Sequence, residues 1–138
     1  MSSTESPHPQ YAAPKRKLPL TEADLARLRP IVRSAKHFLK GRPYIELIDQ
    51  TLNDADVIPP EAIPQDVVTV NSSVVVTELD HQRQSVYTLV FPQDARSSDH
   101  LVSLMTPLGA ALLGGGIGEV IEVAGSRLRI DQVIRGAT

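Results

Sequence analysis

The segment 106–114 constrains the fold of this chain more than any other part of the sequence. Thr106 and Pro107 are typical of a helix start, because a threonine hydroxyl can accept a hydrogen bond from a free backbone N–H and proline needs no N–H there. Gly114 is typical of the left-handed residue that ends a helix. Strand-like runs lie on both sides. The segment therefore predicts a short helix of roughly two turns between strands of a sheet.

Length and composition are those of one small domain with extensions. Of the 138 residues, 41% are hydrophobic and only 4% aromatic, so the core must consist mainly of Val, Leu, Ile and Ala. The chain has no cysteine, which excludes disulfides and thiolate metal sites and fits a reducing compartment. No apolar run approaches the ~20 residues that cross a bilayer, and the first residues lack the apolar segment of a signal peptide. We expect a cytoplasmic protein without a membrane partner.

Two apolar seams predict an antiparallel helical hairpin at residues 21–56. Thr21 begins the first helix, Gly41 can end it, and Pro43 can begin the second. Pro30 lies inside the first helix and costs ~3 kcal/mol there, so we expect a kink. The seams have the narrow spacing of a short coiled coil. They consist of Leu25, Leu28, Val32, Ala35 and Leu39, followed by Ile45, Ile48, Leu52 and Ala55.

Charge is segregated between the two halves of this hairpin, although the net charge of the chain is only −2. Every charged residue between Asp24 and Glu46 is basic, and every one from Glu46 to Asp56 is acidic. A coiled coil held by ion pairs explains this pattern. Direct nucleic-acid binding is less favoured, because the acidic helix cancels much of the field, so any DNA association should be weak or indirect. The predicted tip consists of Lys36, Lys40, Gly41 and Arg42.

The remaining segments predict an α+β fold. Residues 1–20 are rich in Ser and Pro and predict a disordered tail, whereas residues 57–65 hold three prolines and predict an extended, stiff linker. Residues 93–99 predict a loop. Strands are predicted at 66–70, 73–79, 85–91, 100–105, 119–123 and 127–133, the last two joined by a turn at Ala124 and Gly125.

Three patterns that resemble catalytic or ligand sites have ordinary structural explanations. The glycines at 114–118 follow a helix and precede a strand, the reverse of the order in a phosphate-binding loop. The four histidines are scattered and lack the spacing of metal pairs. Asp99 and His100 follow Ser97 and Ser98, but adjacent side chains diverge along an extended chain and cannot form a relay. We therefore expect no metal, cofactor or small-molecule substrate.

Several motifs resemble the GreA/GreB transcription elongation factors, most closely their short Rnk-like members. The resemblance covers most of residues 22–135 and lies in the segments 57–61, 63–72, 88–92 and 106–114, with Gly118, Glu119 and Val120 after them. It implies that residues 66–138 form an FKBP-like domain, a strongly bent antiparallel sheet wrapped on one short helix. It also implies that the hairpin is a shortened counterpart of the Gre coiled coil.

The resemblance also implies a function. Gre factors insert their coiled coil into the secondary channel of RNA polymerase, where acidic residues at its tip help to hold a magnesium ion for transcript cleavage. Carboxylate oxygens are the ligands that such chemistry needs, and no acid lies between Asp24 and Glu46 in this chain. The resemblance, with this departure, implies a bacterial transcription regulator that binds RNA polymerase, is not an enzyme and does not stimulate cleavage.

The resemblance assigns polymerase binding to the loop that precedes the capped helix. The corresponding residues, here called the docking loop, are Met105, Thr106, Pro107 and Leu108. Thr106 stands where Ser is usual, and Met105 stands where a Gre factor can carry Asp, so the docking surface is expected to be more apolar.

Two alternatives stay open on the sequence alone. One is an FKBP-like peptidyl-prolyl isomerase, although such an enzyme needs an aromatic-lined pocket and this chain has only five dispersed aromatic residues. The other is an oligomerisation module built on the hairpin seam. The sequence does not indicate the regulated genes, the sign of the effect, the oligomeric state or whether the hairpin enters the channel.

Overall fold

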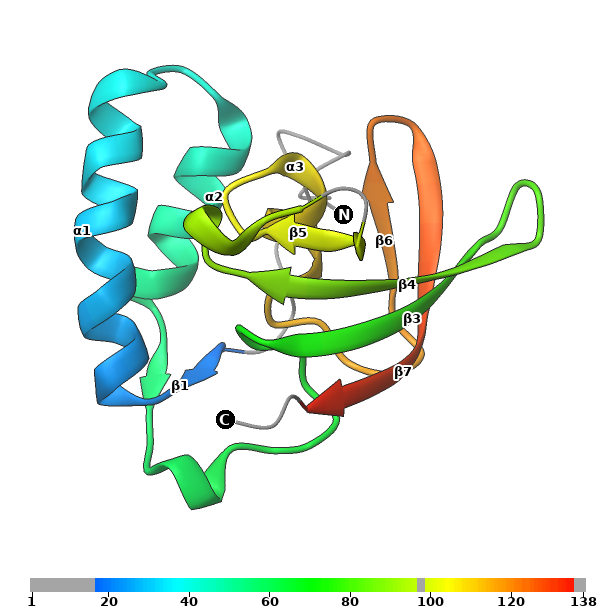
Figure 1. Ribbon diagram of the computed structural model, residues 1–138, viewed down its shortest axis with the longest axis horizontal. Helices are drawn as coiled ribbons and strands as arrows, with labels where there is room; N and C mark the ends of the chain where they lie inside the picture. The colour runs from blue at the N-terminus through cyan, green and yellow to red at the C-terminus, as the bar shows by residue number, and fades with distance from the viewer. Residues whose placement is uncertain (1–16, 97–98, 136–138) are drawn as a thin grey trace, which may run out of the picture.

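A helical hairpin packs against a curled sheet and one short helix in the computed structural model, which describes residues 17–96 and 99–135 (Figure 1). The class is α+β, as predicted. The helices are α1 (Glu22–Phe38), α2 (Pro43–Asn53) and α3 (Pro107–Leu112), with short 3-10 helices at Pro60–Ala62 and Pro92–Asp94. The strands are β1 (Pro19–Leu20), β2 (Asp56–Val57), β3 (Ser72–Glu78), β4 (Arg83–Val90), β5 (Leu101–Ser103), β6 (Val120–Val123) and β7 (Ser126–Arg135).

The main sheet has five strands in the order β5-β4-β3-β7-β6. All neighbouring pairs are antiparallel except β4 and β5, which are parallel, with Thr88 opposite Leu101. The expectation of a wholly antiparallel sheet was therefore wrong at this edge. Pro92 begins a 3-10 helix after β4, and the chain returns along β4 before β5 starts. Because the chain first returns to the start of β4, β5 runs in the same direction as β4, whereas a tight hairpin turn would have made the two strands antiparallel.

Most predicted strands are confirmed within a few residues, but the strand predicted at 66–70 is wrong. In this segment the only bridge of the β type is an isolated one between Val67 and Gly116. Val68 donates its N–H to the carbonyl of Gly115 at 2.9 Å and accepts from the N–H of Gly114 at 2.8 Å. The valines of the segment 66–70 are buried against the glycine turn after α3. This burial explains why the segment has the composition of a strand although it does not form one. The turn between β6 and β7 lies at Ala124 and Gly125, as predicted, with φ values of 50° and 87°.

The end of the predicted tail belongs to the fold. Leu18 and Leu20 are 2% and 1% exposed, and β1 pairs in parallel with β2, Leu20 lying opposite Val57. Two leucines that alternate with one proline are too short a pattern to reveal a strand in the sequence. Residues 1–16 lie outside the described residues. The predicted linker is also not extended throughout, because the 3-10 helix at Pro60–Ala62 interrupts it.

The hairpin forms with the predicted ends. The hydroxyl of Thr21 accepts a hydrogen bond from the N–H of Asp24 at 3.1 Å, and α1 continues through Pro30 as one helix. After α1, Gly41 adopts a φ of 80°, a conformation that side chains disfavour. Pro43 then begins α2. The helices are joined by an ion pair between Lys36 and Asp49 at 2.9 Å.

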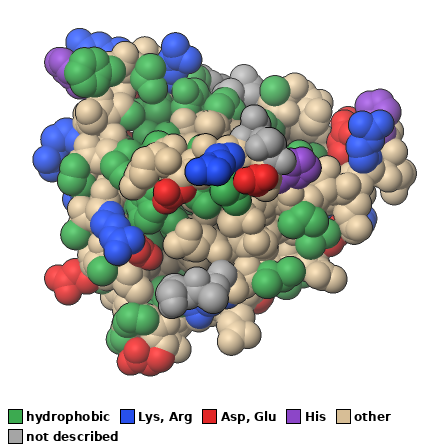
Figure 2. Space-filling model, viewed as in Figure 1, with side chains coloured by type: hydrophobic (Ala, Val, Ile, Leu, Met, Phe, Trp, Pro, Cys, Tyr) green, Lys and Arg blue, Asp and Glu red, His purple; other side chains and the backbone are tan. Residues whose placement is uncertain are grey.

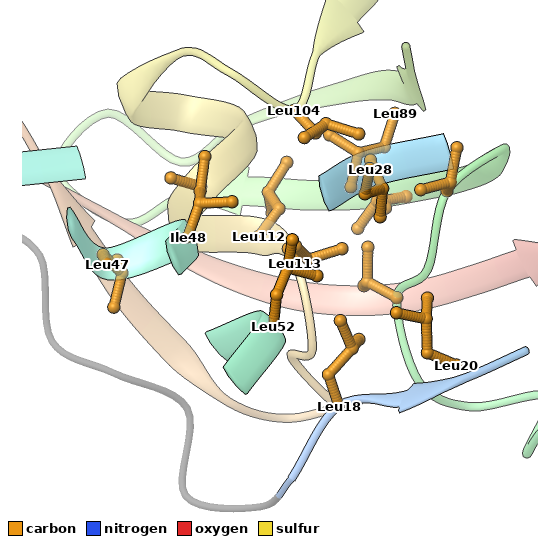
Figure 3. Close-up of a cluster of buried hydrophobic side chains, with 14 of the residues drawn as sticks. Leu18, Leu20, Leu28, Leu47, Ile48, Leu52, Leu89, Leu104, Leu112 and Leu113 are labelled. Atoms are coloured by element: carbon orange, nitrogen blue, oxygen red, sulfur yellow. The ribbon is translucent and has the colours of Figure 1, made fainter. Parts of the chain in front are cut away.

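One hydrophobic cluster includes residues of the hairpin, the sheet and α3. Ile48 and Leu52 of α2 lie beside Leu112 and Leu113 (Figure 3). Because α2 packs against both α1 and α3, its buried face is wider than the predicted seam and also includes Leu47. The division of the sequence into hairpin, linker and C-terminal domain stays a prediction. No helix in the described ranges is both long and apolar enough to cross a membrane.

Candidate docking site

The docking loop is held by three hydrogen bonds around the start of α3. The hydroxyl of Thr106 accepts from the N–H of Gly109 at 3.0 Å, which confirms the predicted helix cap, and donates to the carbonyl of Ser103 at 2.7 Å. The hydroxyl of Ser103 in turn accepts from the N–H of Met105 at 3.0 Å. The hydroxyls of Ser103 and Thr106 therefore fix the path of the backbone between β5 and α3.

Close packing between the backbones of α3 and β5 also supports the docking loop. A Cβ atom on Gly109 would lie 2.1 Å from the carbonyl oxygen of Ser103 and 2.7 Å from the Cα of Leu104. Real Cβ atoms do not approach that closely, so only glycine lets α3 rest on the end of β5. The sequence analysis missed this role of Gly109. The available signal was a second glycine inside the predicted helix, whose end Gly114 already marks, because a glycine inside a helix indicates close packing.

All four residues of the docking loop are partly exposed. The side chains of Met105 and Leu108 also pack against the hydrophobic cluster, so each presents only part of its surface to solvent. The four predicted residues, which are consecutive in the chain, thus form one partly exposed surface. This surface is mostly apolar, with the hydroxyl of Thr106 engaged in the bonds described above.

The tip of the hairpin differs from the prediction in one residue. Lys40, Gly41 and Arg42 lie at the turn and are exposed, but Lys36 lies on the flank of the hairpin, where its ion pair with Asp49 occupies it. The hydrogen bond and the charge of Asp49 raise the pKa of the Lys36 ammonium. The last residue of α1, Phe38, is 76% exposed and belongs to the tip instead. We use the term tip loop for residues 38–42.

The tip loop and the docking loop belong to one packed body. Helix α2 begins directly after the tip loop and packs against α3, which begins within the docking loop. Figure 1 shows the start of α2 and helix α3 in the same upper part of the molecule. In Figure 2, hydrophobic side chains gather over this part of the visible face, and Lys and Arg side chains lie at its upper edge.

Within the described ranges, the other sequence patterns do not assemble into a reactive site. In the described part of the chain, no group of three or more His, Asp or Glu side chains could hold a metal ion. His100 stacks on Tyr87 with ring centroids 5.7 Å apart, and its Nδ1 lies 3.1 Å from the carbonyl oxygen of Val86. Ser97 and Ser98 lie outside the described residues.

A groove of about 360 Å³ lies between α3 and the inner face of the sheet. Among the described residues that line it, Tyr87 is the one aromatic, and Glu78 and Arg83 add charge. Leu108 borders it as well, so the groove adjoins the docking loop. A groove of this kind does not provide the aromatic enclosure that would remove water from a prolyl peptide bond.

Comparison with known proteins identifies similar chains. Residues 63–131 match the family described as "Transcription elongation factor, GreA/GreB, C-term". The chain is 40% identical over 82 residues to the regulator of nucleoside diphosphate kinase from Escherichia coli strain K12, a match that covers 59% of this chain and 60% of that protein. It is 33% identical over 91 residues to the transcription elongation factor GreA of Acetivibrio thermocellus, covering 66% of this chain and 56% of that one.

A solved structure extends the similarity to nearly the whole described fold. The transcription elongation factor GreA/GreB from Nitrosomonas europaea superposes with a TM-score of 0.75 at 32% sequence identity, covering 86% of this chain and 99% of the other. The sequence match to the Escherichia coli regulator, in contrast, spans about 60% of the length of that protein.

Proposed function

Because this chain belongs to the GreA/GreB family of transcription elongation factors, we propose that it is a transcription regulator that binds RNA polymerase. The observation that carries the proposal is the docking loop: within the matched residues 63–131 it is both partly exposed and rigidly held. The bent sheet around α3 would be the FKBP-like domain of the Gre factors. The protein would act in the bacterial cytoplasm, where its partner is.

The docking loop would be the main anchor on the polymerase. Met105, Pro107 and Leu108 would offer apolar contact area, and the bonds of Thr106 to Ser103 and Gly109 hold the loop in one conformation. A preformed surface loses little conformational entropy on binding, which favours affinity. With Met105 in place of an acid, this anchor would bind through burial of apolar surface and not through an ion pair.

The test of this anchor is binding of purified core RNA polymerase by wild-type protein and a double variant, Thr106→Ala with Pro107→Ala. We expect markedly weaker binding by the variant. Since loss of the cap also costs about 1 kcal/mol of stability, the variant must be shown to be folded. Thr106→Ser keeps both hydrogen bonds and serves as the matched control. Wild-type affinity in a folded double variant would refute the assignment of the anchor.

The hairpin would dock at the mouth of the secondary channel without supporting transcript cleavage. Helix α1 has 17 residues and spans about 26 Å at 1.5 Å per residue. The tip loop carries Lys40 and Arg42 but no acid, and cations repel the magnesium ion that cleavage requires. The protein would therefore occupy the channel mouth and compete with longer factors.

A cleavage assay on backtracked elongation complexes checks this part of the proposal. Saturating protein should leave the cleavage rate of the polymerase unchanged, and it should slow the cleavage stimulated by a Gre factor that is added at a limiting concentration. Clear stimulation by this protein alone would show that the position of the tip has been wrongly inferred. We propose no isomerase activity, because the described lining of the groove beside Leu108 contains a single aromatic residue.

A further inference from the structure

We propose that Phe38 is a second anchor, which inserts into an apolar pocket with an acidic rim on the RNA polymerase. The inference deepens the proposed function and rests on it. It adds a residue that is absent from the expected docking loop and from the predicted basic tip. Three features of the hairpin support it: the exposure of the phenyl ring, the exposed cations beside it and the attachment of the hairpin to the rest of the fold.

Phe38 is exposed to a degree that folding does not explain. Its side chain is 76% exposed at the last position of α1, whereas Leu28 and Val32 on the packed face of the same helix are 0% and 2% exposed. The ring contact described for Phe38 is an edge-to-face one with His37, at 4.9 Å between centroids. A large aromatic side chain that does not pack in the core is available for a partner, and buried aromatic anchors contribute strongly to interfaces.

The charges around Phe38 indicate an acidic partner. Lys40 and Arg42 lie within four residues of it and are exposed. Among the described residues, neither has an acidic side chain within ion-pair distance, whereas Lys36 on the flank is paired with Asp49. Two cations that lack an internal partner and flank an aromatic ring match a pocket with an apolar floor and acidic groups on its rim.

Among the residues that the structure describes, the ring of Phe38 is also too isolated for a nucleic-acid platform. Binding of single strands uses several aromatic side chains on which successive bases stack. Near the tip, Tyr44 is partly buried and packs against the hydrophobic cluster, so it offers no second free ring for a base. A protein pocket is therefore the occupant that the side chains favour.

The tip loop is held in a defined place relative to the docking loop. Strands β1 and β2 pair at the base of the hairpin, and α2 packs against α3. A polymerase that holds the docking loop therefore meets Phe38 at a reproducible position. Two contacts on one rigid body act together, because the second forms without a further loss of overall rotational freedom.

The experiment compares the affinity of labelled wild-type and variant proteins for purified core RNA polymerase. Phe38→Ala should weaken binding about tenfold or more, the effect typical of an aromatic anchor, while Phe38→Leu should restore part of it. Val86→Ala is the matched control, because Val86 is also exposed, at 47%, but lies on the outer face of β4. All variants should keep the wild-type thermal midpoint.

A charge reversal tests the acidic rim. Lys40→Glu combined with Arg42→Glu should weaken binding and reduce its dependence on salt. Lys17→Glu is the control, because Lys17 is also exposed but lies just before β1, at the base of the hairpin and not at its tip. Equal effects of the reversal at both sites would contradict a rim specific to the tip.

The outcomes separate this inference from the proposed function. If wild-type protein does not bind core polymerase, the proposed function fails. If it binds and Phe38→Ala binds equally well, only the second anchor fails. Two further results would overturn the inference in favour of another occupant. One is self-association of the wild type that Phe38→Ala abolishes. The other is that Phe38→Ala loses binding to a single-stranded RNA oligonucleotide while its affinity for the polymerase is unchanged.

Discussion

Asp131 is the residue that bends the longest strand of the sheet. Val75 pairs with Gln132 and Val76 with Ile130, so Asp131 is an extra residue in β7 and forms a bulge. The bulge presents the carboxylate to three donors: the hydroxyl of Thr77, Nε of Arg129 at 2.7 Å and Nε2 of Gln84 at 3.3 Å. The bond from Thr77, followed by that from Arg129, lowers the pKa of Asp131.

This network predicts a pH-dependent contribution to stability. Because the pKa of Asp131 is lower in the folded than in the unfolded chain, its carboxylate stabilises the fold above the unfolded pKa of about 3.9. The contribution is lost as the pH falls through the folded pKa. Asp131→Asn should therefore lower the free energy of unfolding by about 1 kcal/mol at pH 7, and the difference from wild type should shrink below about pH 4.

Urea denaturation at several pH values measures this effect. Asp80→Asn is the control, because Asp80 pairs with Arg127 at 3.2 Å in an exposed ion pair, and such pairs contribute little. A difference between wild type and Asp131→Asn that stays constant from pH 7 to pH 3 would rule out a role for the charge.

Gly109 gives a second prediction for a single residue. Gly109→Ala places a methyl group 2.1 Å from the carbonyl oxygen of Ser103, and backbone atoms cannot move aside as a side chain can. We expect a loss of about 1–3 kcal/mol, as for overpacked cores, although alanine is the better helix former. Gly118→Ala, where φ is 92° and the space is open, should cost about 1 kcal/mol. Equal thermal shifts for the two variants would contradict the close approach of α3 to β5.

At this scale, sequence reasoning recognised features that depend on near neighbours and missed those that depend on distant ones. The caps at Thr21 and Thr106 follow from the chemistry of a hydroxyl three residues before a free N–H, and both are present. The necessity of glycine at position 109 depends on the position of Ser103 after folding. The exposure of Phe38 likewise depends on where α1 ends relative to the core.

Among the elements, α1 is notable because it tolerates a proline in its middle. Pro30 is exposed and α1 is continuous across it, although proline removes one backbone hydrogen bond and crowds the preceding turn. Pro30→Ala should therefore raise the free energy of unfolding by about 1–3 kcal/mol. Pro43→Ala is the comparison, because proline at the first position of α2 needs no N–H and its replacement should bring no gain.

Denaturation of the two variants decides the point. A variant Pro30→Ala that is no more stable than wild type would mean that the helix already avoids the cost of the proline, for example by a local bend.

Elements were predictable where periodicity and end signals agreed. Both hairpin helices and the strands β3, β4, β6 and β7 satisfy this condition. The segment 66–70 has the composition of a strand, but its valines are buried because the turn after α3 covers them. Apolar content alone does not separate these two cases. Strand β5 was predicted in sequence, but its parallel pairing depends on the path of the loop before it.

At the scale of the molecule, the hairpin and the sheet share one hydrophobic cluster, and the residues before α1 help to close it. Leu20→Ala should therefore destabilise the whole protein by about 2–5 kcal/mol, as for other buried leucines. Calorimetry should show one cooperative transition at a lower temperature. Two transitions, with only the first shifted, would show that the hairpin unfolds independently of the sheet.

The hydrophobic cluster also determines how the two parts of the candidate site are placed relative to each other. The position of the docking loop was accessible from a motif, but its relation to the tip loop required the contact between α2 and α3. In that contact Ile48 and Leu52 lie beside Leu112 and Leu113 (Figure 3), and the buried face of α2, which also includes Leu47, is wider than the stripe of a free coiled coil.

Because the base of the hairpin is closed, the length of the hairpin can change without changing how the hairpin is attached to the rest of the fold. The N–H groups of Asp56 and Ile58 donate to the carbonyls of Leu18 and Leu20 at 2.8 and 2.9 Å, so the pairing of β1 with β2 closes the base of the hairpin. Helical turns inserted in equal number on both sides of Gly41 would lengthen the hairpin without disturbing this pairing or the contact of α2 with α3. The length of the hairpin can thus vary by paired insertions at its tip, while the docking loop keeps its position in the fold.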